Sequence, residues 1–204
     1  MAGRTPSLED RPSRAYTRLV TALSIALLLF AAGERTYASY RVRDEAKAHA
    51  LAAKAVQIQG ENPQGWCYLY VLRAMTAADI LPKQYWKTLK TESAYQFAFG
   101  RRGADFPARF SLKLVPKYAP WKEGTIVVWN RDADGRHSCG RDTKLGKAHG
   151  HIEIVVDPRS LGRPERPGSY LSCFGMCGYT SLNKVNSYLR KGCIRVYEPS
   201  RLSS

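Results

Sequence analysis

The hydrophobic pattern changes its period once, near residue 105, and this change constrains the fold more than any other feature of the sequence. Before it, segments 39–60, 66–81 and 83–103 predict helices, because they combine helix-forming composition or helical spacing of apolar residues with Gly or Pro at their ends. After it, the apolar runs are short, rich in β-branched residues and bounded by proline and glycine, as strands are. The predicted strands lie within residues 109–116, 124–130, 151–156, 169–182 and 192–199. Helices followed by an antiparallel sheet define the α+β class.

One predicted helix begins at a cysteine. In the sequence GENPQGWCYLYVLRAM, Pro63 and Gly65 form a turn directly before Cys67, and an apolar run with helical spacing follows. Cys67 is therefore expected at a helix N-terminus, with Pro82 ending the helix.

The predicted strand HIEIVV at 151–156 begins at a histidine. Alternate residues of a strand face opposite sides of the sheet, so one face is wholly aliphatic and is expected to contact the core. The other face starts with His151 and Glu153. We expect this end of the strand to present the imidazole to a cleft, with the carboxylate beside it.

The N-terminus has the pattern of an export signal. Residues 1–18 contain four arginines, and residues 19–33 form an uncharged apolar run. The run of about 15 residues is shorter than the roughly 20 of a full membrane span, so it fits both a cleaved signal and a weak anchor. A buried core helix fits less well, because the flanks are strongly basic. The protein is expected to be exported across, or anchored in, the cytoplasmic membrane, with its domain in the periplasm or cell-wall space.

The sequence predicts three parts in the chain. Residues 1–38 form the export signal or signal-anchor, with a hydrophobic N-terminal helix. Residues 39–60 form a helical linker that resembles a stalk, and residues 61–204 form the globular domain.

The net charge is unusual for a globular protein. The 32 lysines and arginines exceed the 17 acidic residues, which gives a formal charge of +15 at pH 7. Such a field attracts nucleic acid, an anionic membrane or an acidic cell wall, or it serves solubility alone. The basic residues are scattered and follow an export signal, so no specific nucleic-acid partner is expected.

The five cysteines differ in their surroundings. In an oxidising compartment four of them can pair, in three alternative connectivities, and one is left over. Four lie in the C-terminal third and Cys67 stands alone, which makes it the candidate reactive thiol. The alternative is a zinc site, less favoured in this compartment. Its ligands would be His137, Cys139, Cys173 and Cys177.

A cysteine at a helix N-terminus opposite a histidine is an arrangement that activates a nucleophile. The thiol pKa of about 8.5 falls beside an imidazolium or a helix N-terminus, and a third polar group orients the base. The first N–H groups of the helix, with Gln64 as a side-chain donor, are candidates for holding an oxyanion. The simpler reading makes Cys67 a small buried hydrophobic residue. His149 competes with His151 for the role of base, because both lie on the same face.

Three motifs together resemble the CHAP and NlpC-type cysteine peptidoglycan amidases and endopeptidases. GWCYLYV, APWKEGTIVVWN and GHIEIVV occur in the order of that family, over Gly65 to about Tyr197. The resemblance implies a papain-like fold, with Cys67 as nucleophile and His151, not His149, as general base. It implies a cysteine hydrolase. No cofactor is expected.

Two positions depart from the family pattern. Thr125 stands where the family has an aspartate. The third catalytic residue of the family lies on the strand after the histidine, where this chain offers Ser172 and Cys173 and no carboxylate. Glu153, on the histidine's own strand, is therefore assigned as the third catalytic residue, or else as a substrate contact.

The segment NRDADG has the spacing of a calcium loop. Asn130, Asp132 and Asp134 alternate before Gly135, but the twelfth position is Arg141 rather than a bidentate glutamate. The segment also joins strands rather than helices. A solvated turn without a metal is therefore expected.

Taken together, these features predict a peptidoglycan hydrolase that cleaves an amide bond in stem peptides, as a phage endolysin or an antibacterial effector. Its partners would be peptidoglycan and an anionic wall or membrane surface, and the protein would be a monomer. Two other functions are compatible with the sequence: a non-catalytic wall- or membrane-binding module on the same fold and, more remotely, a basic nucleic-acid-binding protein.

Overall fold

The structure, a computed structural model of the chain, describes residues 41–60, 66–102, 105–115, 121–132, 139 and 144–203. Residues 42–202 belong to one compact unit. The predicted export signal at 1–38, with its hydrophobic helix, lies outside the described residues. Among the helices that the structure describes, none has both the length and the apolarity that crossing a membrane requires.

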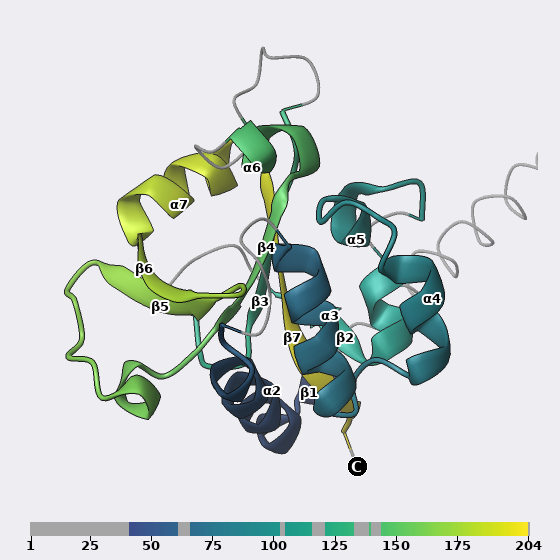
Figure 1. Cartoon of the computed structure of the whole chain (residues 1–204), viewed down its shortest axis with the longest axis horizontal. Helices are drawn as coiled ribbons and strands as arrows, with labels where there is room; N and C mark the ends of the chain where they lie inside the picture. Colours follow the sequence, from purple (N-terminus) through teal and green to yellow (C-terminus); the bar gives the residue numbers. More distant parts are fainter. Residues whose placement is uncertain are drawn as a thin grey trace, which may run out of the picture. The chain divides into compact units, whose positions relative to one another are not determined.

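The described strands form a seven-stranded sheet with the order β1-β7-β3-β4-β5-β6, and β2 pairs with β7. The pairs β2–β7, β3–β7, β3–β4, β4–β5 and β5–β6 are antiparallel. The protein is therefore an α+β protein with an antiparallel sheet, as the change of period predicts (Figure 1). The strands are β1 (Arg41–Arg43), β2 (Leu112–Leu114), β3 (Ile126–Trp129), β4 (His151–Val155), β5 (Ser169–Cys173), β6 (Cys177–Ser181) and β7 (Ile194–Leu202).

The three longest α-helices lie at two places in the chain. Helices α2 and α3 lie between β1 and β2, and α7 lies between β6 and β7. The helices are α2 (Glu45–Gln57), α3 (Cys67–Ala77), α4 (Trp86–Leu89), α5 (Gln96–Phe99), α6 (Lys144–His149) and α7 (Leu182–Arg190). Short 3₁₀ segments lie at Lys83–Tyr85, Phe106–Phe110 and Pro158–Leu161.

The helix predicted at 66–81 begins at Cys67, as expected, but ends four residues early, at Ala77. Asp79 adopts a left-handed backbone conformation (φ 52°), which a helix cannot continue through. The N–H groups of Ile80 and Leu81 then donate to the carbonyl of Met75. The chain therefore turns before Pro82, and the proline is not the helix terminator.

The segment 83–103 forms short helical pieces instead of the one helix predicted. Between α4 and α5, Ser93 N–H donates to the Gln96 side chain, and Tyr95 N–H donates to the carbonyl of His149. These contacts redirect the backbone away from a continuous helix, and the contact to His149 spans 54 positions of the sequence. Such tertiary contacts override a weak local preference.

Three further elements were not predicted from the sequence. These are the edge strand β1, of three residues, the short helix α6, in a segment that its polar composition predicts as a loop, and α7 between β6 and β7. The predicted strand at 109–116 is reduced to β2, because residues 106–110 form a 3₁₀ segment.

Helix α2, predicted as a linker, is part of the domain. Leu51, Ala52 and Ala55 are buried in the same cluster as the residues of α3. Gly124, at the start of β3, has φ 74°, and a Cβ there would lie 2.2 Å from the carbonyl oxygen of Ala48. The close packing of α2 on the sheet places it inside the compact unit, so the boundary predicted at residue 60 does not separate two bodies.

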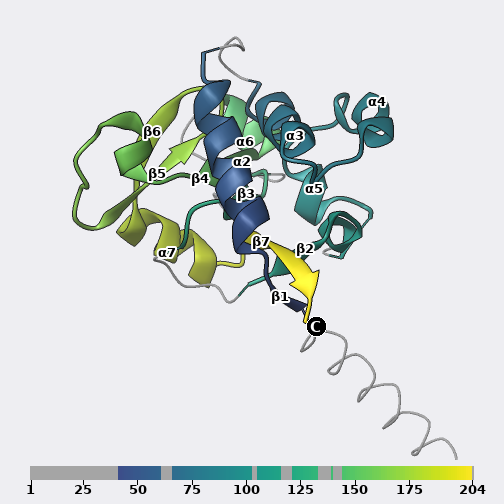
Figure 2. The same ribbon diagram turned by 90° about the horizontal axis from the view of Figure 1, so that it is seen from below.

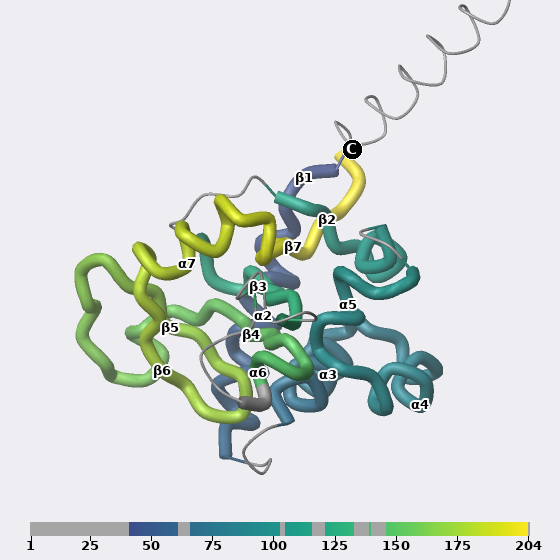
Figure 3. Tube along the Cα trace, turned by 90° about the horizontal axis from the view of Figure 1, so that it is seen from above, coloured from purple at the N-terminus to yellow at the C-terminus, as the bar shows by residue number. Residues whose placement is uncertain are grey.

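The two faces of β3 and β4 carry different cores. Figures 2 and 3 show α2 and α3 on one side of the sheet and α7 on the other. Ile152 and Ile154 join the larger cluster with α2 and α3, as the alternation of the strand predicts. Trp129 and Val155 join a second cluster that Val185 of α7 completes.

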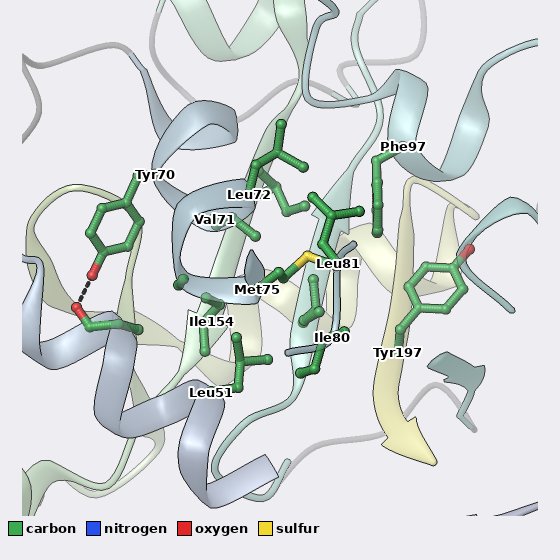
Figure 4. Packing of buried hydrophobic residues seen from close by; sticks show 14 of the residues in the cluster. Leu51, Tyr70, Val71, Leu72, Met75, Ile80, Leu81, Phe97, Ile154 and Tyr197 are labelled. Atoms are coloured by element: carbon green, nitrogen blue, oxygen red, sulfur yellow. Dashed lines mark hydrogen bonds between the residues drawn. The ribbon is translucent and has the colours of Figure 1, made fainter. Parts of the chain in front are cut away.

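The larger cluster is built mainly from aliphatic and aromatic side chains of α2, α3 and the sheet. Figure 4 shows Leu72 and Met75 of α3 directed toward the strands. Tyr70 is fully buried, and its hydroxyl donates to the carbonyl of Ala55 in α2. This bond satisfies the polar tip of a buried ring and joins the two helices. The result is a rigid support for the first turn of α3.

Candidate active site

Cys67 is the first residue of α3, and α3 packs against β4. No side chain caps this helix, so its first N–H groups have no intrahelical partner. The backbone N–H groups of Ile152 in β4 and of Tyr68 both act to lower the pKa of the Cys67 thiol. The sulfur therefore lies between the helix N-terminus and the start of the strand. Cys67 is half-buried and is not in a disulfide.

A tight turn at Gly150 places His151 next to the Cys67 sulfur. Gly150 joins α6 to β4 with φ 67°, and a Cβ on it would lie 2.5 Å from the Trp129 carbonyl oxygen and 2.7 Å from the Tyr95 Cβ. Both the conformation and the space require glycine. His151 then starts β4 in register with Trp129 of β3.

Cys67 and His151 form a hydrogen-bonded pair. Burial raises the pKa of the Cys67 thiol, but the hydrogen bond and positive charge of His151 outweigh it, and the pKa is lowered. Burial lowers the pKa of His151, but the hydrogen bonds to Cys67 and Glu153 and their negative charges raise it overall. The two shifts have opposite directions and both favour a thiolate beside an imidazolium.

Glu153 lies behind the histidine and is completely buried. Its Oε2 is 3.4 Å from His151 Nε2, which leaves Nδ1 as the ring nitrogen for the sulfur. A buried carboxylate is costly unless hydrogen bonds compensate for the lost water. Trp129 Nε1 donates to Oε1 at 3.0 Å, the Tyr170 hydroxyl also donates to Oε1, and Ser172 Oγ donates to Oε2 at 2.7 Å. A carboxylate only accepts hydrogen bonds, so three donors suit its ionised form.

The structure brings together the three site residues predicted from the sequence: Cys67, His151 and Glu153. The competing histidine is held elsewhere, since His149 Nδ1 lies 3.0 Å from Ser93 Oγ. Gln64 lies outside the described residues. His149 does not lie on the strand at all, because the chain turns at Gly150 between the two histidines.

Sequence reasoning missed the donors to Glu153. Tyr170 and Ser172 are two apart on β5, so they share a face, and this spacing was the available signal. Which face they share depends on how β5 pairs with β4. The register Val155↔Ser172 was not deducible from either strand alone. The sequence offers Ser172 at the family's third catalytic position. In the structure its hydroxyl instead donates to the Glu153 carboxylate.

The four remaining cysteines form disulfides, Cys139–Cys193 and Cys173–Cys177. This pairing removes three of the four ligands considered for zinc, and His137 lies outside the described residues. Within the ranges that the structure covers, no group of three or more His, Cys, Asp or Glu side chains is arranged to hold a metal ion. Asp134, Gly135 and Arg141 of the calcium-like spacing also lie outside those ranges.

A cavity of about 810 Å³ lies at the opposite end of β4, beside Val155 and Asp157. Trp121 and Tyr170 line it, together with charged side chains of both signs, but Cys67, His151 and Glu153 do not. Tyr170 thus borders this cavity, and its hydroxyl also donates to the Glu153 carboxylate. The reactive group itself lies outside the cavity.

The site combines an activated thiol, a base and a carboxylate that orients the base. This is the arrangement of nucleophilic acyl transfer. Compared with known proteins, the chain matches no protein-family model, no curated sequence and no solved structure.

Proposed function

We propose that the protein is a cysteine hydrolase with a papain-like arrangement that cleaves an amide bond in the stem peptides of peptidoglycan. The observation that carries the proposal is the line of contacts from Cys67 through His151 to the buried Glu153. A structural cysteine would need neither the base nor the carboxylate. Burying an ion pair and a carboxylate costs free energy, and chemistry is the reason to keep them.

The reaction begins with the thiolate of Cys67. Its sulfur attacks the carbonyl carbon of the amide, and the electron pair of the C=O bond moves to the oxygen. The His151 imidazolium then gives its proton to the leaving nitrogen, the C–N bond breaks, and a thioester remains on Cys67. Water, deprotonated by His151, adds to the thioester. The C–S bond breaks, which releases the carboxylic acid and restores the thiolate.

Glu153 keeps the imidazole in one orientation throughout these steps. Its contact to Nε2 directs the opposite ring nitrogen to the sulfur and stabilises the imidazolium. The N–H of Cys67, at the first position of α3, has no partner within the helix and is suited to hold the oxyanion that forms beside the sulfur.

The choice of peptidoglycan rests on the sequence motifs and on charge. The CHAP/NlpC-like motifs coincide with the residues of the site, and the formal charge of +15 suits an anionic wall. A cation also lies close to the turn at Gly150 that precedes His151. Arg131 stacks over the ring of Tyr95, and the Tyr95 N–H donates to the His149 carbonyl. This position suits a substrate that carries carboxylates.

The non-catalytic alternative is less well supported. It rested on the lack of a third catalytic residue on the strand after the histidine. Glu153, with three donors and no exposure to solvent, supplies a carboxylate from the histidine's own strand and favours the enzyme.

The test compares three alanine variants on purified sacculi. Cys67→Ala and His151→Ala should each lower clearing by more than about 10³-fold, because each removes a group that bonds to the reacting atoms. Both should melt near the wild-type temperature. His149→Ala is the matched control and should clear at the wild-type rate.

Mass spectrometry of the released muropeptides then identifies the bond that is cut. Clearing that persists in Cys67→Ala would refute the proposal. Equal losses in the two histidine variants would refute the assignment of the base.

A further inference from the structure

The turn between β5 and β6 is closed by a disulfide. Cys173 and Cys177 are the last and first residues of the two strands, and they pair across a turn of three residues. Both cysteines are buried and belong to the larger core cluster. The disulfide therefore fastens the turn to the core on the side of the sheet where α3 lies.

The turn contacts the catalytic histidine. The ring of Phe174 lies 4.6 Å from the His151 ring, centroid to centroid, in a T-shaped arrangement with an interplanar angle of 78°. Contacts of this geometry are favourable beyond the area they bury. Phe174 is half-buried and the neighbouring Met176 is 48% exposed, so the turn forms an apolar edge of the site.

A second contact ties the same turn to the segment before the nucleophile. The N–H of Gly60 donates to the Gly175 carbonyl at 2.9 Å. Gly60 ends the stretch that follows α2, seven residues before Cys67 in the sequence. The turn thus touches the histidine directly and is bonded to the chain that leads to the cysteine.

We infer that Phe174 is a positioning residue for His151 and that the Cys173–Cys177 disulfide holds it in place. This inference rests on the proposed roles of Cys67 and His151. Cys67 on α3 and Glu153 on β4 are titratable groups that face the imidazole. Phe174 supplies an apolar contact from a third element.

The physical reason is the geometry of proton transfer. The imidazole must direct one ring nitrogen to the sulfur and the other to Glu153, and a rotation of the ring breaks both contacts. The T-shaped contact restrains this rotation and excludes water beside the ring. Ordering the group before the reaction removes an entropic cost from each catalytic step.

The experiment measures the rate at which iodoacetamide alkylates Cys67 as a function of pH. Cys67 is the free thiol of the described chain, and the assay needs no peptidoglycan. Phe174→Ala should move the midpoint of the alkylation curve upward, by about one pH unit toward the ordinary thiol value. Phe174→Tyr, which keeps the ring, should restore the wild-type midpoint.

The disulfide is tested by a matched pair of double variants. Cys173→Ala/Cys177→Ala should shift the midpoint in the same direction as Phe174→Ala. Cys139→Ala/Cys193→Ala removes the other disulfide, which links a residue between β3 and α6 to the residue directly before β7. This variant should leave the midpoint unchanged. Circular dichroism identifies any variant that fails to fold. If a double variant does not fold, the result for Phe174→Ala decides the positioning role.

Different outcomes refute the proposed function and the positioning role of Phe174. A wild-type midpoint at the value of a free thiol would refute the proposed function. A lowered wild-type midpoint that Phe174→Ala leaves in place would refute the positioning role alone. Equal shifts in the two double variants would refute the specific role of the Cys173–Cys177 disulfide.

Discussion

The two faces of β4 bury side chains to the same extent but by different chemistry. Ile152 and Ile154 are fully buried against α2 and α3. On the opposite face, Glu153 is fully buried among hydrogen-bond donors, and His151 is 6% exposed. The aliphatic face gains free energy from every carbon removed from water. The polar face must recover in hydrogen bonds what it loses in hydration.

The difference teaches how one strand serves stability and chemistry together. The aliphatic face holds β4 rigidly against α3, so the helix N-terminus and His151 meet at a defined place. The polar face keeps a charged group in surroundings where its electric field is little screened. Substitutions on the two faces should therefore change different measurements.

The largest effect is expected on the polar face, at the carboxylate. Glu153→Gln removes the charge and hydrogen bond that raise the pKa of His151, and turnover should fall by about 10²–10⁴-fold. The imidazolium is present below the raised pKa of His151 and is lost above it, so activity of the wild type should fall at alkaline pH. In the variant that falling limb should move to lower pH, and the thiolate limb to higher pH. A pH profile of unchanged shape would contradict the role of Glu153.

The aliphatic face should respond in stability instead. Ile154→Ala leaves a cavity between β4 and the helices, and the free energy of unfolding should fall by about 2–5 kcal/mol. The limbs of the pH profile should keep their positions, because Ile154 packs into the core cluster and alternation along the strand turns it away from His151 and Glu153. Urea unfolding and the alkylation curve of Cys67 together test this. A shift of the curve would show that the two faces are not independent.

The smallest effect is expected at a single donor of the polar face. Tyr170→Phe removes one hydrogen bond to Glu153 but leaves Trp129 on the same oxygen. The free energy of unfolding should fall by about 1.5 kcal/mol, with a loss of activity of a few-fold. Tyr179→Phe, on the neighbouring strand, is the control, because the Tyr179 hydroxyl bonds to the Pro164 carbonyl and not to Glu153. Equal losses of activity in both variants would contradict a specific effect at the carboxylate.

Much of the site could be predicted from the sequence because it depends on local order. The residues Pro63 and Gly65 before Cys67 predict the helix start, and alternation along residues 151–156 separates His151 and Glu153 from the aliphatic face. The helix at 83–103 could not be predicted correctly, because contacts such as Tyr95 to His149 arise only in the folded chain. The helix α7 was missed because its apolar residues are few and only the second core cluster accounts for them.

The sequence by itself determined the class of the fold, the pairing of a helix-start cysteine with a strand-start histidine, and the isolation of Cys67 from the other thiols. These are properties of spacing and composition along the chain. The tertiary structure alone decided that His149 is held against Ser93, that Glu153 is satisfied by Trp129, Tyr170 and Ser172, and that Phe174 packs on the imidazole. The reason is physical: strand register and packing are set by contacts between distant segments, and the free energy of those contacts depends on the whole core.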